Sequence, residues 1–131
     1  MTKKNSKKNI SIIGLGYVGL PLAVEFSKKF NVVGYDTNSL RVDDLNLAID
    51  KTNEVDKKEL YNVLNLNHQL KNKGLVITSD ISQVADTDVF IITVPTPIDK
   101  NKKPDLTPLA NATKNISKFV RKGNIIIYES T

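Results

Sequence analysis

The chain has 131 residues, 40% of them hydrophobic and 25% charged, a size and composition typical of one globular domain with its own core. It contains no cysteine, which excludes a disulfide, a thiolate zinc site and a cysteine nucleophile among these residues. The formal net charge of +5 arises largely from lysines in the first eight residues, and only 6% of the residues are aromatic, so no nucleic-acid-binding surface is predicted. No apolar run is long enough to span a membrane and no cluster of residues suggests a metal site, and we expect a cytoplasmic protein.

The hydrophobic pattern divides the chain into a basic, flexible tail at residues 1–8 and one domain at residues 9–131. In chain order the pattern predicts a strand at residues 9–13, a helix at 17–30, a strand at 31–35, helices at 39–49 and 56–66, a strand at 75–78, a short helix at 81–84, a strand at 88–94, a helix from 107 to 123 and a strand at 124–128. The strands are continuous apolar runs separated by helices, which is typical of a parallel sheet covered on both faces. We therefore predict a Rossmann-type, doubly wound α/β fold of about five strands in the order 3-2-1-4-5.

Three single residues carry further predictions. Thr107 is the predicted N-cap of the last helix and is followed by a proline, a residue favoured at the first helical position. Gly123 is the predicted end of that helix. The single histidine, His68, lies in a polar stretch at a helix end, where we expect its side chain to be solvated.

The stretch "IIGLGYVGLPLA" places three glycines at G-x-G-x-x-G spacing, directly after the first predicted strand and before the first helix. In a dinucleotide site of this kind Gly14 makes the tight turn, Gly16 lets a pyrophosphate approach the backbone, and Gly19 lets the helix pack closely against the sheet. The free N–H groups at the helix start favour the phosphate charge.

The second requirement of such a site is an acidic residue about twenty positions further on, at the end of the next strand, and Asp36 meets it. Its carboxylate can accept hydrogen bonds from ribose hydroxyls and would repel a 2′-phosphate, which favours NAD over NADP. The alternative is that Asp36 only caps the helix that follows.

Five longer stretches make the pattern more specific: "IIGLGYVGLPLAVEF", "VVGYDTNSLRV", "FIITVPTPID", "PDLTPL" and "IIIYEST". Together they resemble the NAD-binding half of the UDP-glucose/GDP-mannose dehydrogenase family, and most of all the branch that oxidises UDP-N-acetylhexosamines. The resemblance implies an NAD-dependent UDP-sugar 6-dehydrogenase that oxidises the C6 alcohol of UDP-N-acetylgalactosamine, -glucosamine or -mannosamine to the uronic acid with two NAD. It also implies a role in bacterial polysaccharide biosynthesis.

The same resemblance implies which residues contact the cofactor. At the pyrophosphate they are Gly14, Gly16, Tyr17, Val18 and Gly19; at the adenosine, Asp36 and Arg41; after the fourth strand, Val94, Pro95 and Thr96; on the nicotinamide side, Ser130 and Thr131. Arg41 could stack on the adenine, pair with Asp36, or be an ordinary solvated helix residue. Thr131 is in addition an auxiliary catalytic candidate close to the reacting sugar carbon.

In the family, the cysteine nucleophile and the UDP-sugar-binding residues lie in the second half of the chain, in central and C-terminal domains. The sequence here ends at Thr131, so we expect an NAD-binding half that binds a UDP-sugar only with those further domains and is inactive alone. Its last strand would then form an open apolar edge, through which the chain could self-associate. The alternative is a stand-alone NAD-binding module without catalysis, and a downstream G-G-x-C-type segment in the same frame would decide against it.

Overall fold

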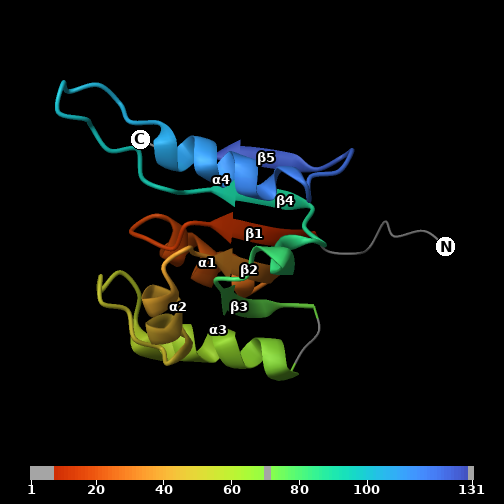
Figure 1. The fold of residues 1–131 in the computed structure, drawn as a ribbon. Coiled ribbons are helices and arrows are strands. Elements are labelled where there is room, and N and C mark those ends of the chain that lie inside the picture. Colours follow the sequence, from red (N-terminus) through yellow and green to blue (C-terminus); the bar gives the residue numbers. More distant parts are fainter. Residues whose placement is uncertain (1–7, 70–71, 130–131) are drawn as a thin grey trace.

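The computed structural model describes residues 8–69 and 72–129, so almost all of the basic tail predicted at residues 1–8 lies outside the described residues. The elements are β1 (Asn9–Ile13), α1 (Gly19–Ser27), β2 (Asn31–Tyr35), α2 (Ser39–Asn46), α3 (Lys57–Gln69), β3 (Gly74–Thr78), a short 3-10 helix η1 (Ile81–Val84), β4 (Val89–Ile92), α4 (Thr107–Ser117) and β5 (Ile125–Tyr128). Figure 1 shows how these elements alternate along the chain. No helix within the described ranges is long and apolar enough to cross a membrane.

The five strands form one parallel sheet in the order β3-β2-β1-β4-β5, which confirms the predicted fold and strand order. The central strand β1 pairs with β2 on one side and with β4 on the other, so that Ile12 lies between Gly34 and Ile91. The order of strand addition reverses at β1, and the carboxyl ends of β1 and β4 therefore flank a crevice of the kind that binds ligands in such sheets.

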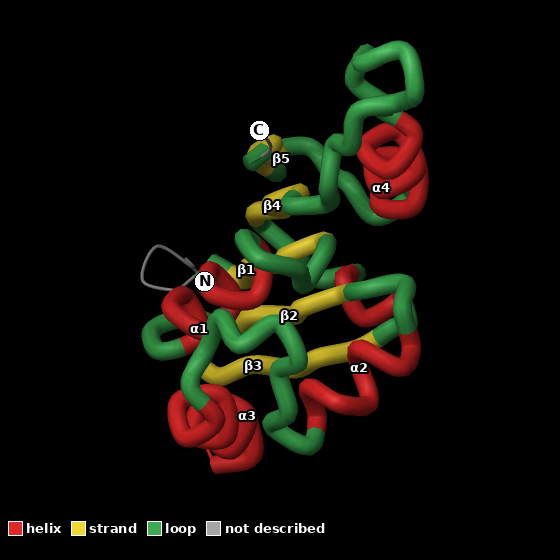
Figure 2. Tube along the Cα trace, turned by 90° about the vertical axis from the view of Figure 1, so that its left-hand side faces the viewer, coloured by secondary structure: helices red, strands yellow, loops and turns green. Residues whose placement is uncertain are grey.

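Two buried clusters cover the two faces of the sheet. One cluster joins α1, α2 and α3 to strands β1, β2 and β3, and the other joins α4 and η1 to β1, β2 and β4. Figure 2 shows α4 and α3 on different sides of the sheet. Neighbouring residues of β1 divide between the clusters, because successive side chains of a strand point to opposite faces: Ile12 packs in the first and Ile13 in the second.

Several predicted boundaries were wrong. Helix α1 begins at Gly19 rather than residue 17, and α4 ends at Ser117 rather than at Gly123. Gly123, with φ +92°, instead lies in the turn before β5. Thr107 is the first helical residue and not the N-cap, a position that Leu106 holds while the Asp105 carboxylate accepts a hydrogen bond from the Thr107 N–H.

The last strand is the exposed edge of the sheet. All four residues of β5 are exposed, and Ile125 retains 54% of its accessible surface. The apolar composition of this strand is typical of a buried one, yet no other strand among the described residues pairs with its outer edge. His68 lies in α3, and its side chain is outside the described part of the structure.

Candidate functional site

Residues 14–19, here called the glycine loop, run from the end of β1 to the first residue of α1. Gly14 has φ +106° and donates its N–H to the Tyr35 carbonyl at 2.8 Å, which makes the tight turn that the spacing predicts. A Cβ at Gly19 would lie 1.7 Å from the Gly14 carbonyl oxygen and 2.5 Å from Thr93 Oγ1, so only glycine fits there. A Cβ at Gly16 would meet no atom within 4 Å, which leaves this stretch of backbone open to a ligand.

The N–H groups at the start of α1 have no hydrogen-bond partner among the described residues. In the described part of the chain, the N–H groups of Gly16, Tyr17, Val18 and Gly19 donate to no other group, and the first donor of the helix is Leu20, which bonds the Gly16 carbonyl at 3.1 Å. The positive end of the helix dipole adds to these donors. This end of α1 can therefore hold a phosphate group.

Asp36 follows β2 and lies beside the glycine loop. One carboxylate oxygen accepts the Leu15 N–H and the other accepts the Asn38 N–H, both at 2.9 Å. The N-cap of α2 is Asn38, whose side chain accepts from Leu40 and Arg41, so the alternative that Asp36 caps this helix is wrong. An ionised carboxylate has about four acceptor positions, and those left on Asp36 can accept hydroxyl groups.

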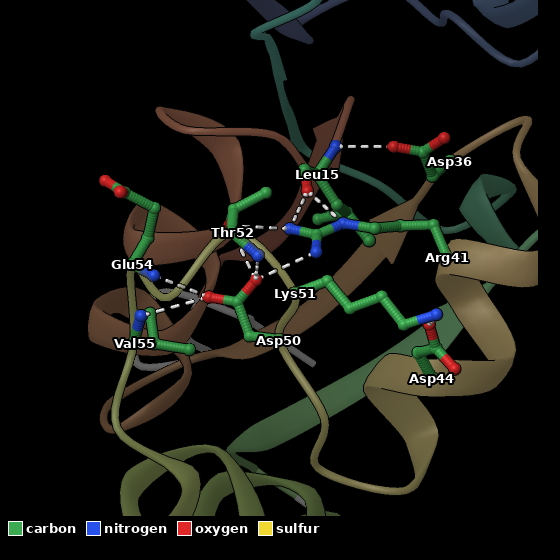
Figure 3. A network of polar contacts seen from close by, with 9 residues as sticks. All are labelled: Leu15, Asp36, Arg41, Asp44, Asp50, Lys51, Thr52, Glu54 and Val55. Atoms are coloured by element: carbon green, nitrogen blue, oxygen red, sulfur yellow. Dashed lines mark hydrogen bonds and ion pairs between the residues drawn. The ribbon is translucent and has the colours of Figure 1, made fainter.

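Arg41 makes contacts that differ from those expected. Its guanidinium donates from Nε and Nη2 to the Leu15 carbonyl at 2.9 and 2.6 Å, and from Nη1 to Asp50 Oδ1 at 2.8 Å (Figure 3). The alternative in which Arg41 pairs with Asp36 is thus wrong, and with its side chain only 13% exposed Arg41 is not a solvated helix residue either. It joins the glycine loop to residues 50–55, here called the Asp50 loop.

Asp50 is a buried carboxylate that sequence reasoning missed. Burial alone would raise its pKa, but hydrogen bonds from Thr52, Arg41 and Glu54 outweigh that effect and hold the pKa of Asp50 well below its ordinary value. The carboxylate is therefore ionised at neutral pH. The Asp-x-Thr spacing of Asp50 and Thr52 is typical of an Asx-turn and was the available signal, but it does not reveal the arginine.

A cleft of 530 Å³ opens at the carboxyl edge of the sheet, between the glycine loop, the ends of β2 and β4, and helix α4. Five of the predicted cofactor contacts line it: Gly14, Gly16, Asp36, Val94 and Pro95. Five others lie outside its lining: Tyr17, Val18, Gly19, Arg41 and Thr96. The predicted contacts Ser130 and Thr131 lie outside the described residues.

The far wall of the cleft was not predicted. Thr93 is buried at the end of β4, and its hydroxyl donates to the Gly14 carbonyl at 2.6 Å, which ties β4 to the glycine loop. On α4, Thr107, Asn111 and Asn115 line the cleft at a spacing of four residues, which places them on one helix face. Asp105 lies beside them, and hydrogen bonds from the hydroxyl and the N–H of Thr107 lower its pKa.

This arrangement fits a dinucleotide. N–H groups without a partner at residues 16–19 suit a pyrophosphate, which Gly16 leaves room for, and the Asp36 carboxylate beside them suits ribose hydroxyls. Among the described residues, no group of histidine and acidic side chains could hold a metal ion.

Comparison with known proteins agrees with this geometry. Residues 8–131 match the NAD-binding domain of the UDP-glucose/GDP-mannose dehydrogenase family. The chain is 49% identical over 122 residues to a UDP-N-acetyl-D-glucosamine 6-dehydrogenase of Pseudomonas aeruginosa, covering 93% of this chain and 27% of that protein. It is 39% identical over 136 residues to a UDP-N-acetyl-D-mannosamine dehydrogenase of Methanocaldococcus jannaschii, covering 98% of this chain and 29% of that protein.

Among solved structures, a UDP-D-ManNAc dehydrogenase from Pyrococcus horikoshii superposes with a TM-score of 0.82 at 31% identity, over 94% of this chain and 28% of that one. The chain thus spans less than a third of the length of these relatives.

Proposed function

We propose that this chain forms the cofactor-binding part of a UDP-N-acetylhexosamine 6-dehydrogenase. The premise is that the chain belongs to the UDP-glucose/GDP-mannose dehydrogenase family, in which it corresponds to the NAD-binding domain. The names of its relatives, which include UDP-N-acetyl-D-glucosamine and UDP-N-acetyl-D-mannosamine dehydrogenases, support this choice of sugar. The whole enzyme would oxidise the C6 alcohol of the sugar to a uronic acid with two NAD, in the cytoplasm, as a step of bacterial polysaccharide biosynthesis.

Bound NAD supplies the acceptor for the hydride that leaves the substrate. The contribution of this chain is to bind and orient the cofactor. The N–H groups of residues 16–19 would hold the pyrophosphate, and Gly16 would leave room for it at the backbone. Asp36 would accept hydrogen bonds from the adenosine ribose, while its charge disfavours a phosphate at the 2′ position.

The remaining predicted contacts complete the proposed site. Val94 and Pro95, at the end of β4, would form a wall against the cofactor, with Thr96 next to them. Ser130 and Thr131 would lie on the nicotinamide side, with Thr131 close to the reacting carbon, as the family resemblance implies. Pyrophosphate, ribose and nicotinamide would thus follow one another along the carboxyl edge of the sheet.

The single observation that carries the proposal is the set of N–H donors at residues 16–19 that have no partner among the described residues, with the Asp36 carboxylate beside it. Calorimetric titration of the chain with NAD and with NADP tests the cofactor part. We expect binding of NAD and weaker binding of NADP, and equal or tighter binding of NADP would overturn the assignment.

The substrate part requires the product of the whole gene. Its NADH production should be measured with UDP-glucose and with UDP-N-acetylglucosamine, -galactosamine and -mannosamine. We expect one of the three N-acetylated sugars to be the preferred substrate. A preference for UDP-glucose would place the enzyme in another branch of the same family.

A further inference from the structure

The buried carboxylate of Asp50 is not accounted for by direct cofactor binding. Its side chain is only 3% exposed, and it does not line the cleft. It accepts hydrogen bonds from Arg41 Nη1 at 2.8 Å, from the N–H and hydroxyl of Thr52 at 2.9 and 2.6 Å, and from the N–H groups of Glu54 and Val55 at 2.7 and 3.1 Å. A carboxylate with this many donors is fixed in place, and so is the guanidinium that it contacts (Figure 3).

The guanidinium of Arg41 passes this constraint on to the glycine loop. Guanidinium is a rigid plane, so the bond from Nη1 to Asp50, together with the attachment to the rest of the Arg41 side chain, restricts the directions in which Nε and Nη2 can point. Both of these nitrogens donate to the Leu15 carbonyl. The N–H of Leu15 is held by Asp36, and its side chain is fully buried against Gly34. Leu15 is thus fixed through its N–H, its carbonyl and its side chain.

Holding the Leu15 carbonyl has two consequences for the open donors. This carbonyl shares a planar trans peptide with the Gly16 N–H, so the N–H points in the opposite direction, away from Arg41. The same carbonyl is the one that the Gly19 N–H would bond if the helical hydrogen bonds began one residue earlier than Leu20 to Gly16. Because Arg41 occupies it, the Gly19 N–H has no partner in the described structure.

We propose that Asp50 is a positioning residue for cofactor binding: it orients Arg41, which holds the Leu15 carbonyl and thereby keeps the N–H groups of the glycine loop directed at the pyrophosphate. The proposal rests on the proposed function, since it presupposes that NAD binds at this loop. It differs from a direct contact between Arg41 and adenosine, because the effect on the cofactor passes through the backbone of residues 15 and 16.

The sign of the effect separates this role from simple electrostatics. Asp50→Asn removes a negative charge near the site, so Coulomb's law alone predicts tighter binding of the anionic cofactor. The positioning role predicts weaker binding, because a neutral amide orients the guanidinium less firmly. We expect the dissociation constant for NAD to rise roughly threefold to tenfold, the range of one hydrogen bond.

Arg41→Lys is the second variant, since it keeps the charge and does not depend on a buried asparagine being tolerated. An ammonium group cannot hold Asp50 and contact the Leu15 carbonyl twice in the geometry of a guanidinium. We expect the same loss of NAD affinity. The matched control is Lys51→Gln, which removes the neighbouring ion pair of Lys51 with Asp44, at 3.2 Å, without touching the glycine loop. Its NAD affinity should equal that of the wild type.

The experiment measures binding of NAD and of adenosine to each folded variant of the chain, together with amide hydrogen exchange at Gly16 and Gly19. We expect Asp50→Asn and Arg41→Lys to weaken NAD more than adenosine, which has no pyrophosphate, and to alter exchange at both amides. Unchanged or tighter NAD binding in the variants, or equal losses for NAD and adenosine, would overturn the positioning role. Failure of the wild type to bind NAD would instead contradict the proposed function.

Discussion

Adding a single methyl group to the glycine loop should separate ligand binding from folding. In Gly16→Ala the new Cβ meets no atom within 4 Å, and the backbone at this residue is not in the left-handed region. The free energy of unfolding without ligand should therefore stay the same or rise by up to roughly 1 kcal/mol, because alanine restricts the unfolded chain. The methyl group would, however, occupy the space next to the open N–H donors. We expect NAD affinity to fall by about 1–3 kcal/mol, the usual cost of overfilling a packed contact.

Gly19→Ala, in contrast, should lower the stability of the fold. Its Cβ would lie 1.7 Å from the Gly14 carbonyl oxygen, against the 3.4 Å at which ordinary contacts begin, so backbone atoms have to move. The clash should outweigh the roughly 1 kcal/mol that alanine gains over glycine in a helix. We expect a net loss of about 1–3 kcal/mol in unfolding free energy and a melting temperature several degrees lower.

The assay combines thermal melts followed by circular dichroism, without ligand, with calorimetric titration of NAD. Each variant serves as the control for the other, because both carry the same chemical change three residues apart. If Gly16→Ala melts well below the wild type, or binds NAD as tightly, the assigned open space at Gly16 is wrong. If Gly19→Ala is as stable as the wild type, the close approach to Gly14 does not constrain the loop.

Further predictions concern other parts of the molecule. Asp36→Ala should weaken NAD binding by about 1–3 kcal/mol and narrow the preference over NADP, measured by titration with both cofactors; an unchanged preference would contradict the role of this carboxylate. The pKa of folded Asp50 lies below its ordinary value of 3.8, so its stabilising contribution is present above that pH and is lost as the pH falls further. The free energy of unfolding should therefore fall less on acidification in Asp50→Asn than in the wild type, and parallel curves of unfolding free energy against pH would refute this. The exposed strand β5 should cause self-association, which sizing chromatography would show and which Ile125→Lys should reduce; a wild type that stays monomeric at high concentration would contradict this. NAD at a hundred times its dissociation constant should stabilise the fold by about 2.7 kcal/mol, and an unchanged melting temperature with NAD would contradict this expectation.

The features that were predicted correctly depend on short-range signals. The strands are compact apolar runs, and the turn at Gly14 follows from glycine spacing after a strand. The boundaries of α4 failed because Thr107 and Gly123 are residues that often cap helices, whereas here the Asp105 side chain binds the first helical N–H and Gly123 serves a later turn. Local propensity gives no information on which of two compatible roles a residue will take.

The Arg41–Asp50 pair could not be predicted for a different reason. The segment between α2 and α3 bends through two non-glycine residues in the left-handed region, Ala48 with φ 60° and Asn53 with φ 56°. This uncommon path brings Asp50 to 2.8 Å from the guanidinium. The pairing of Arg41 with Asp36 does not form because the Arg41 guanidinium instead donates to the Leu15 carbonyl and to Asp50.

The glycine loop depends on segments far away in the sequence, and this sets the order in which binding ability arises during synthesis. Leu15 is held by Asp36 and Arg41, while Gly14 is held by Tyr35 and by the Thr93 hydroxyl, 79 residues further along the chain. A nascent chain released as far as α3 would contain the entire glycine motif and its acidic partner, yet it would lack the strand that anchors the turn. Contacts over such separations form late, because a long loop has to close first. We therefore expect the cofactor to bind the nascent protein only after β4 has joined the sheet. It would then stabilise the folded domain and would not assist the folding of an incomplete chain.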